Sequence, residues 1–167
     1  MHSSLVLDSG AFYAGTSFLS SDDQFYTTSP VLEEVKHIKG YFSALEALRL
    51  SGRLVIQDPD RSQIEKALRV ATKTGDRGSL SEADVSIIAL ALQLHKTLVT
   101  DDYAVANVAA LLGVEVKPAT AGKEIKETRR WIFFCSGCSR TFNRSEKECP
   151  LCGNKLKRKY RKFRSDS

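Results

Sequence analysis

The sequence predicts an α/β sandwich with a mainly parallel sheet, followed by a small four-cysteine zinc ribbon. Along residues 1–118, short apolar runs alternate with segments of helical periodicity, which is typical of strands and helices that alternate in an α/β domain. All 4 cysteines lie in the last third of the chain. With 167 residues and a hydrophobic content of 42%, the chain can form one ordinary domain with its own core and one small module.

The first expected element is a buried strand that ends in an acid. Leu5–Leu7 is an apolar run that stops at Asp8, so it favours a parallel strand whose end delivers a carboxylate to one edge of the sheet. An aspartate in this place also commonly caps the next helix, which we expect over Ala11–Leu19. The aromatic and threonine side chains of Gln24–Thr28 favour a second strand.

A Ser-Pro pair at residues 29–30 is typical of a helix start, with the serine as the N-cap, and the helix is expected to end before Gly40. Two acids of this helix, Glu33 and Glu34, follow the second strand closely. One of them could point toward the same edge as Asp8. Both could instead serve only the helix dipole.

The middle of the chain continues the alternation. The expected elements are a helix over Tyr41–Leu50, a strand over Arg53–Gln57, a helix over Arg61–Thr72 and a polar loop over Lys73–Ser79. The next helix, Leu80–His95, is the most apolar of the chain and must be mostly buried. Ser81 and Asp84 near its start fit a capping box.

The predicted first domain closes with one more strand, helix and strand, at Thr97–Thr100, Ala104–Leu112 and Val114–Val116. The strand ends in Asp101 and Asp102, either of which could cap the helix that follows. Because the carboxyl ends of parallel strands meet at one edge, these acids could also converge with Asp8, the glutamates and Asp84. Converging carboxylates repel one another unless a hard cation such as Mg²⁺ or Mn²⁺ lies between them.

The cysteines form two Cys-x-x-Cys pairs, at 135 and 138 and at 149 and 152. Four thiolates at this spacing suit a closed tetrahedral zinc site with a structural role, because no coordination position is left for water. A redox pair is the alternative, but it would need only one Cys-x-x-Cys pair and a βαβ context. We therefore expect Cys135, Cys138, Cys149 and Cys152 to bind one zinc ion.

Charge is distributed unevenly along the chain. Residues 1–122 hold 11 Lys and Arg against 15 Asp and Glu, whereas residues 123–167 hold 14 against 5. The end of the chain is therefore suited to a polyanion, and interleaved aromatic side chains could stack on bases. The candidate nucleic-acid-binding residues are Lys155, Lys157, Arg158, Lys159, Tyr160, Arg161, Lys162 and Arg164. A solvated or partly disordered tail is the alternative, and its deletion after Gly153 is expected to weaken nucleic-acid binding while sparing the zinc.

Other classes of protein are disfavoured. No apolar run is long enough to cross a bilayer, and no secretory leader precedes Asp8, so a cytoplasmic protein without a membrane partner is expected. The sequence offers no Ser-His pair or glycine-rich phosphate loop that would compete with the carboxylates as the reactive group.

In order along the chain, four segments resemble the PIN-domain nucleases. They are Val6-Leu-Asp8-Ser-Gly-Ala, Val31-Leu-Glu-Glu34-Val, Leu80-Ser-x-Ala-Asp84-x-x-Ile-Ile-Ala-Leu-Ala and Leu98-Val-Thr-Asp101-Asp102-Tyr. A PIN domain followed directly by a four-cysteine ribbon and a basic tail is similar to the Nin-one-binding protein family. The resemblance implies an endonuclease that cuts the 3′ end of small-subunit rRNA from its precursor, leaving a 5′-phosphate and a 3′-hydroxyl. It also implies the precursor of the small ribosomal subunit, and protein assembly factors, as partners.

The same resemblance assigns Asp8, Glu34, Asp84 and one or both of Asp101 and Asp102 to a Mg²⁺ or Mn²⁺ site. Glu34 is preferred to Glu33 because the family's acid directly precedes an aliphatic residue. The expected domains are a PIN-like domain (1–118), a linker (119–130), a zinc ribbon (131–154) and a basic tail (155–167). A non-catalytic RNA-binding scaffold and a toxin-type PIN ribonuclease are the alternative functions.

Overall fold

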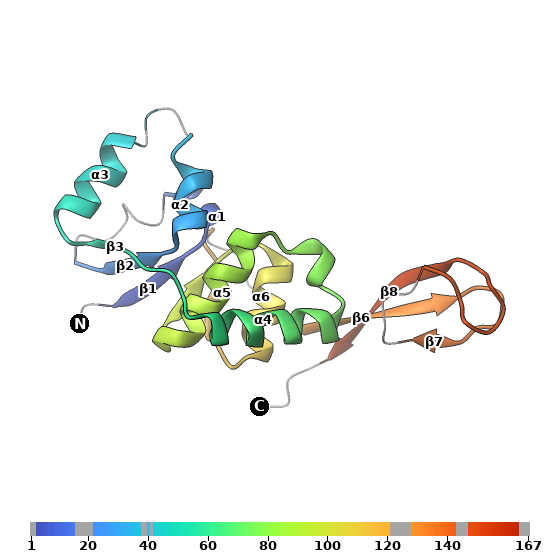
Figure 1. Ribbon diagram of the computed structural model, residues 1–167. Coiled ribbons are helices and arrows are strands. Elements are labelled where there is room, and N and C mark those ends of the chain that lie inside the picture. Colours follow the sequence, from blue (N-terminus) through green and yellow to red (C-terminus); the bar gives the residue numbers. More distant parts are fainter. Residues whose placement is uncertain are drawn as a thin grey trace.

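A five-stranded parallel sheet organises the first two thirds of the chain, with β1 at its centre and the strand order β3-β2-β1-β4-β5 (Figure 1). Its strands are β1 (Ser4–Leu7), β2 (Gln24–Thr27), β3 (Leu54–Ile56), β4 (Thr97–Val99) and β5 (Val116–Lys117). The computed structural model describes residues 3–15, 22–37, 40, 42–120, 128–142 and 147–163, without the side chains of residues 42, 128–131 and 160–163. The predicted parallel α/β architecture is confirmed.

Helices connect the strands. They are α1 (Ser9–Tyr13), α2 (Ser29–Val35), α3 (Phe42–Leu50), α4 (Arg61–Thr74), α5 (Glu82–Leu94) and α6 (Tyr103–Leu111), with a short 3-10 helix at Arg77–Ser79 between α4 and α5. Figure 1 shows α4, α5 and α6 side by side, and α5 contacts α4, α6 and α2. In the part of the chain that is described, no helix is long and apolar enough to cross a membrane.

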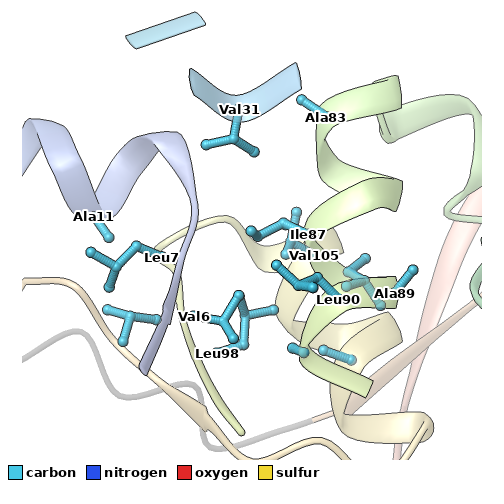
Figure 2. Packing of buried hydrophobic residues seen from close by; sticks show 14 of the residues in the cluster. Val6, Leu7, Ala11, Val31, Ala83, Ile87, Ala89, Leu90, Leu98 and Val105 are labelled. Atoms are coloured by element: carbon cyan, nitrogen blue, oxygen red, sulfur yellow. The ribbon is translucent and has the colours of Figure 1, made fainter. Parts of the chain in front are cut away.

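Helix α5 lies at the centre of the hydrophobic core, as its composition predicts. Ile87, Ile88 and Leu90 are completely buried. Figure 2 shows Ile87 and Leu90 facing the central strand residues Val6 and Leu98. Burial on this scale stabilises the domain by roughly 2 kcal/mol for each large aliphatic side chain. The position of α5 relative to the sheet is therefore firmly fixed.

The register of the sheet aligns the ends of its three central strands. Leu7 pairs with Val99, and Val6 pairs with Tyr26. The residues that come next, Asp8, Thr28 and Thr100, therefore lie together at the carboxyl edge, and all three are buried. This is the edge at which ligands bind in open parallel sheets.

A second, antiparallel sheet follows, with the order β7-β6-β8. Its strands are β6 (Thr128–Cys135), β7 (Thr141–Phe142) and β8 (Leu156–Phe163). We call these strands and the cysteine-bearing turns between them the ribbon. Figure 1 shows the ribbon projecting from the side of the first domain where α4 and α6 lie, and β6 contacts both helices.

Several predicted boundaries in the first domain differ from the structure. Helix α1 begins at Ser9 and ends at Tyr13, while residues 16–19 of the predicted helix lie outside the described residues. Thr28, and not Ser29, is the N-cap of α2, because the Thr28 side chain accepts the hydrogen bond from the Val31 N–H. The Ser29 N–H is donated to Asp58 instead.

The predicted linker and tail contain most of the ribbon's longest strand pair. Strand β6 begins at Thr128, inside the range predicted as linker, and β8 occupies 156–163 of the predicted tail. Their pairing runs from Thr128↔Phe163 to Cys135↔Leu156. The charge pattern hid β8 because its lysines and arginines do not alternate with apolar residues, and strand formation here depends on backbone pairing with the aromatic strand β6.

Deletion of β8 should therefore damage the ribbon, contrary to the prediction from sequence. A chain that ends at Asn154 would leave one edge of β6 without its partner strand, and exposed edges of this kind promote aggregation. We expect the truncated protein to retain less bound metal and to lose amide protection along β6, as measured by metal analysis and hydrogen exchange. Undiminished protection of β6 in the truncated protein would contradict this expectation.

Candidate active site and metal centre

Asp8 lies at the end of the central strand β1 and is only 5% exposed. It is the N-cap of α1, and its Oδ1 accepts a hydrogen bond of 2.7 Å from the Ala11 N–H. The hydroxyl of Thr100, at the end of the neighbouring β4, also hydrogen-bonds the carboxylate. Two strands and one helix thus fix the orientation of this acid.

The environment of Asp8 opposes its ionisation. Loss of solvent on burial is the largest cause, and together with the charges of Asp102 and Asp84 it raises the pKa of Asp8 from 3.8 to about 6. The hydrogen bonds from Thr100 and Ala11 act in the opposite direction. A cation beside Asp8 would relieve both the desolvation and the repulsion between carboxylates.

Asp84 and Asp102 are the two acids whose charges raise the pKa of Asp8. Asp84 completes the predicted capping box of α5: its Oδ2 accepts from the Ser81 N–H at 2.8 Å. Asp102 caps α6, where its Oδ1 accepts from the N–H groups of Ala104 and Val105. The N-termini of α5 and α6 therefore both deliver a carboxylate to the edge that holds Asp8.

Asp101 has a different role from its neighbour. Its Oδ1 accepts from the N–H groups of Ala119 and Thr120, at 2.9 and 3.2 Å, and its Oδ2 accepts from the Thr120 hydroxyl. These contacts fasten the segment after β5 to the end of β4. The two adjacent aspartates therefore have different hydrogen-bond partners.

The two glutamates of α2 also diverge. Glu33 is ion-paired with Lys36 and lines a groove between α2, α4 and α5 together with Glu82. Glu34 lies on the exposed surface of α2. Neither is among the charges that raise the pKa of Asp8.

The four cysteines form a compact group. Their sulfur atoms all lie within 4.8 Å of one another, and none of them forms a disulfide. The backbone N–H of Cys138 is the main cause that lowers the pKa of Cys135 to about 6, which favours its thiolate. Among the described residues, this is the only group of three or more side chains close enough to hold a metal ion without rearrangement.

The predicted RNA-binding residues whose side chains are described lie on β8 or just before it, and all of them are exposed. Lys155, Lys157 and Lys159 are exposed. The side chains of Tyr160, Arg161 and Lys162, and all of Arg164, lie outside the described residues. Arg158 is different, because its guanidinium contacts the first domain.

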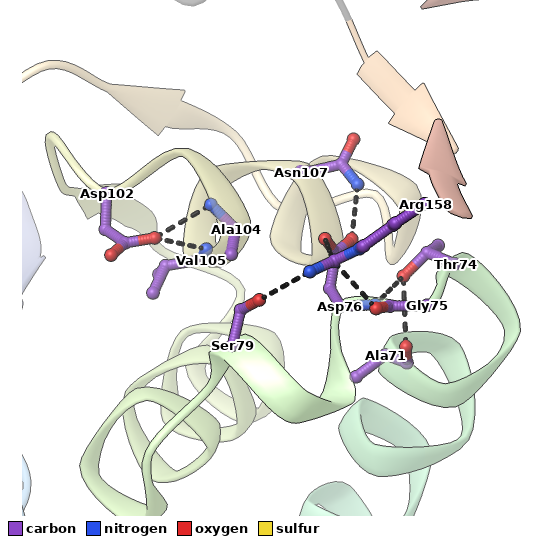
Figure 3. Close-up of polar contacts among 10 residues, drawn as sticks. All are labelled: Ala71, Thr74, Gly75, Asp76, Ser79, Asp102, Ala104, Val105, Asn107 and Arg158. Atoms are coloured by element: carbon purple, nitrogen blue, oxygen red, sulfur yellow. Dashed lines mark hydrogen bonds and ion pairs between the residues drawn. The ribbon is translucent and has the colours of Figure 1, made fainter. Parts of the chain in front are cut away.

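Figure 3 shows Arg158 reaching the loop between α4 and α5. It donates to the carbonyl oxygen of Gly75 at 2.9 Å and to the hydroxyl of Ser79 at 3.3 Å, and it lies 3.8 Å from Oδ1 of Asp76. Asp76 is 1% exposed, and its Oδ2 accepts a 2.7 Å hydrogen bond from the side chain of Asn107 on α6.

Sequence reasoning missed Asp76 and Asn107. A usable signal was present at Asn107, because an amide inside the apolar run of α6 must find a polar partner when it is buried. Thr100 was also missed as a partner of Asp8. It was treated only as the end of a strand.

Comparison with known proteins agrees with this architecture. The family model described as the PIN domain of ribonuclease matches residues 5–94. The protein named Endoribonuclease Nob1 from Pyrococcus abyssi is 37% identical over 163 residues, covering 96% of each chain. The chain belongs to the Nob1 family of PIN-domain endoribonucleases. This family is the Nin-one-binding family that the sequence motifs resemble.

Two further relatives carry other names. Ribonuclease VapC1 from Thermoplasma acidophilum is 34% identical over 160 residues, which is 96% of this chain and 80% of that protein. The protein named 20S-pre-rRNA D-site endonuclease nob1 from Schizosaccharomyces pombe is 34% identical over 93 residues, which is 54% of this chain and 23% of that protein.

The raised pKa of Asp8 predicts how stability changes with pH. In buffer without added Mg²⁺ or Mn²⁺, the folded state binds more protons than the unfolded state between about pH 4 and 6. Stability from this group is therefore present at low pH and lost as the pH rises, by about 3 kcal/mol at 1.36 kcal/mol per pKa unit. Asp8→Asn should melt higher than the unaltered protein at pH 7, with an advantage that shrinks toward pH 4.

Asp60→Asn is the matched control for this measurement. Asp60 is the exposed N-cap of α4, and its side chain makes no capping hydrogen bond. This variant reports what the same chemical change does at an exposed helix cap. If the melting difference between Asp8→Asn and the unaltered protein stayed constant from pH 4 to 7, the raised pKa of Asp8 would be wrong.

Proposed function

We propose that this chain is a divalent-metal-dependent endoribonuclease that matures the 3′ end of small-subunit rRNA. The observation that carries the proposal is that Asp84 and Asp102, at the starts of α5 and α6, lie close enough to Asp8 at the carboxyl edge of the sheet for their charges to raise its pKa. The names of the family members and of the yeast-type relative support RNA cleavage and a pre-rRNA substrate.

The donor set suits a hard cation. Carboxylate oxygens are the preferred ligands of Mg²⁺ and Mn²⁺, and mutual repulsion among the acids is the property that such an ion relieves. We assign Asp8, Asp84 and Asp102 to this ion, with Glu34 available from α2. Asp101 is assigned to holding the segment at residues 119–120, because its oxygens already accept hydrogen bonds there.

The protein's own groups prepare the site for phosphodiester hydrolysis. When bound, the cation would supply an activated water and stabilise the leaving oxygen. Thr100 accepts the Asp102 N–H at 3.0 Å and hydrogen-bonds Asp8, so one hydroxyl sets the relative position of two acids. The helix caps hold the carboxylates in fixed orientations, which lowers the reorganisation needed for in-line attack.

The ribbon is proposed to grip RNA. Zn²⁺ bound by Cys135, Cys138, Cys149 and Cys152 would close a structural site, and the reduced thiols suit a cytoplasmic location. Exposed Lys155, Lys157 and Lys159 are available to phosphates. The RNA would be presented within a precursor of the small ribosomal subunit, together with assembly factors.

Paired substitutions test the metal site. Asp102→Asn keeps the helix cap, since asparagine also caps, but removes a charge from the site. We expect cleavage of an RNA spanning the rRNA 3′ end, in Mn²⁺, to fall on the order of 100-fold for Asp8→Asn and Asp102→Asn. Asp101→Asn, the adjacent control, should remain within a few fold. Unchanged cleavage by Asp8→Asn would refute the proposal.

The same assay discriminates the alternatives. A non-catalytic scaffold would bind this RNA without cutting it at any Mn²⁺ concentration. The VapC1 relative makes a toxin-type ribonuclease the other candidate. Such an enzyme would cut unrelated RNA, such as tRNA, as readily as the rRNA precursor.

Zinc removal tests the proposed structural role. Among the side chains that the structure describes, none of the main hydrophobic cluster comes from the ribbon, so the first domain should stay folded without zinc. Such a small module depends on its metal, and Cys149→Ser should therefore lose amide protection along β6 and β8 while the α5 amides stay protected. Hydrogen exchange measures both. Retained protection of β6 in Cys149→Ser would contradict a zinc-dependent ribbon.

A further inference from the structure

The basic residues of β8 face two different ways. Directly paired residues of an antiparallel sheet place their side chains on the same face, and successive residues alternate. Arg158 pairs with Phe133, while Lys157 pairs with Phe134 and Lys159 with Ile132. Arg158 therefore lies on one face, and the two lysines lie on the other. The face with Arg158 is the one that meets the first domain.

Arg158 is held by more than charge. Its two terminal nitrogens are shared between the Gly75 carbonyl, the Ser79 hydroxyl and the Asp76 carboxylate. The planar guanidinium suits such divided contacts, whereas a lysine ammonium offers a single point of charge. Asp76 is buried and fixed from its other side by Asn107.

The loop that Arg158 contacts is connected to α5 and α6, the two helices whose first turn or N-cap carries Asp84 or Asp102. The loop at residues 75–79 leads directly to Ser81, the N-cap of α5, and to Asp84. Asn107 follows Asp102 on α6 by five residues, which is about 7.5 Å along the helix axis. The loop that Arg158 contacts therefore leads into α5, which carries Asp84, and Asp76 of this loop is hydrogen-bonded to Asn107 of α6, the helix that Asp102 caps (Figure 3).

We propose that Arg158 is a positioning residue that locks the ribbon against the loop at residues 75–79. This role rests on the proposed function: the Arg158 contact sets a fixed distance between RNA held by the opposite face of the ribbon and the carboxylates proposed to act on it. Arg158 is then removed from the set of residues expected to bind RNA, and Lys157 and Lys159 remain in it.

The first test does not depend on activity. In the unaltered zinc-bound protein, ¹⁵N relaxation should give the same rotational correlation time for the ribbon and the first domain. In Arg158→Ala the ribbon should tumble faster than the first domain, with its zinc content unchanged. Equal tumbling of the two parts in Arg158→Ala would overturn the proposal.

The second test separates positioning from RNA affinity. Lys157→Ala is the matched control from the neighbouring position. It should raise KM and make the plot of log binding constant against log salt concentration less steep by about 1, because one phosphate contact is lost. Its kcat and its cut position should be retained. Arg158→Ala should keep KM and the salt slope within about twofold. Its kcat should fall 10-fold or more, with cuts spread to neighbouring phosphodiesters.

Two further variants define the cause. Arg158→Lys keeps the charge but cannot contact Gly75, Ser79 and Asp76 at once, so it should resemble Arg158→Ala. A residue that acts on RNA only through its charge would instead be rescued by lysine. Asp76→Asn should reproduce the kcat loss without removing any basic group. Its melting temperature is measured first, to establish that the variant is folded. Rescue by lysine, or an Arg158→Ala profile matching that of Lys157→Ala, would refute the positioning role. Failure of the unaltered protein to cleave would instead refute the proposed function.

Discussion

The burial of the Asp8 carboxylate is the constraint on which the rest of the structure depends. The central strand of the sheet ends in an acid that is almost without solvent and faces the charges of Asp84 and Asp102. A helix cap alone would not require this, since an exposed aspartate caps as well. The fold keeps an arrangement that opposes ionisation of Asp8, and the cation proposed above would gain affinity by relieving it.

The helices that carry the acids also determine where the ribbon can sit. Helix α5 is fixed by the core, and its N-terminus holds Asp84 next to the loop that receives Arg158. Helix α6 holds Asp102 at its start and Asn107 further along. The packed helices α5 and α6 therefore link the carboxyl edge of the first sheet to the loop at residues 75–79, on which the ribbon docks.

Much of the fold could be predicted from the sequence because local signals and tertiary structure agree there. The apolar run of α5, the Ser81–Asp84 capping box and the strand ending at Asp8 each act within a few residues. The strand β8 could not be predicted in this way. Its partners in β6 lie from 21 positions (Cys135↔Leu156) to 35 positions (Thr128↔Phe163) earlier in the chain, and its composition is that of a solvated tail. The contact between Arg158 and Asp76 joins residues 82 positions apart and leaves no local pattern.

The choice between Asp101 and Asp102 illustrates the same limit at the site. Two adjacent acids at the end of a strand point in different directions, and the sequence does not say which one the neighbouring segment captures. Residues 119–120, far along the chain, supply the hydrogen bonds that occupy Asp101. The α6 backbone N–H groups hold Asp102, and the charge of Asp102 acts on Asp8.

Helix capping and metal binding are compatible roles for these acids. Each carboxylate has two oxygens with several lone pairs. Asp8 and Asp102 accept helix N–H groups through Oδ1, and Asp84 accepts the Ser81 N–H through Oδ2. The capping bond fixes the plane of the carboxylate and leaves lone pairs for a cation. A capping interaction at each of three helix starts would therefore preorganise the proposed ligand set, so the local preference for a capping acid does not conflict with the proposed metal site.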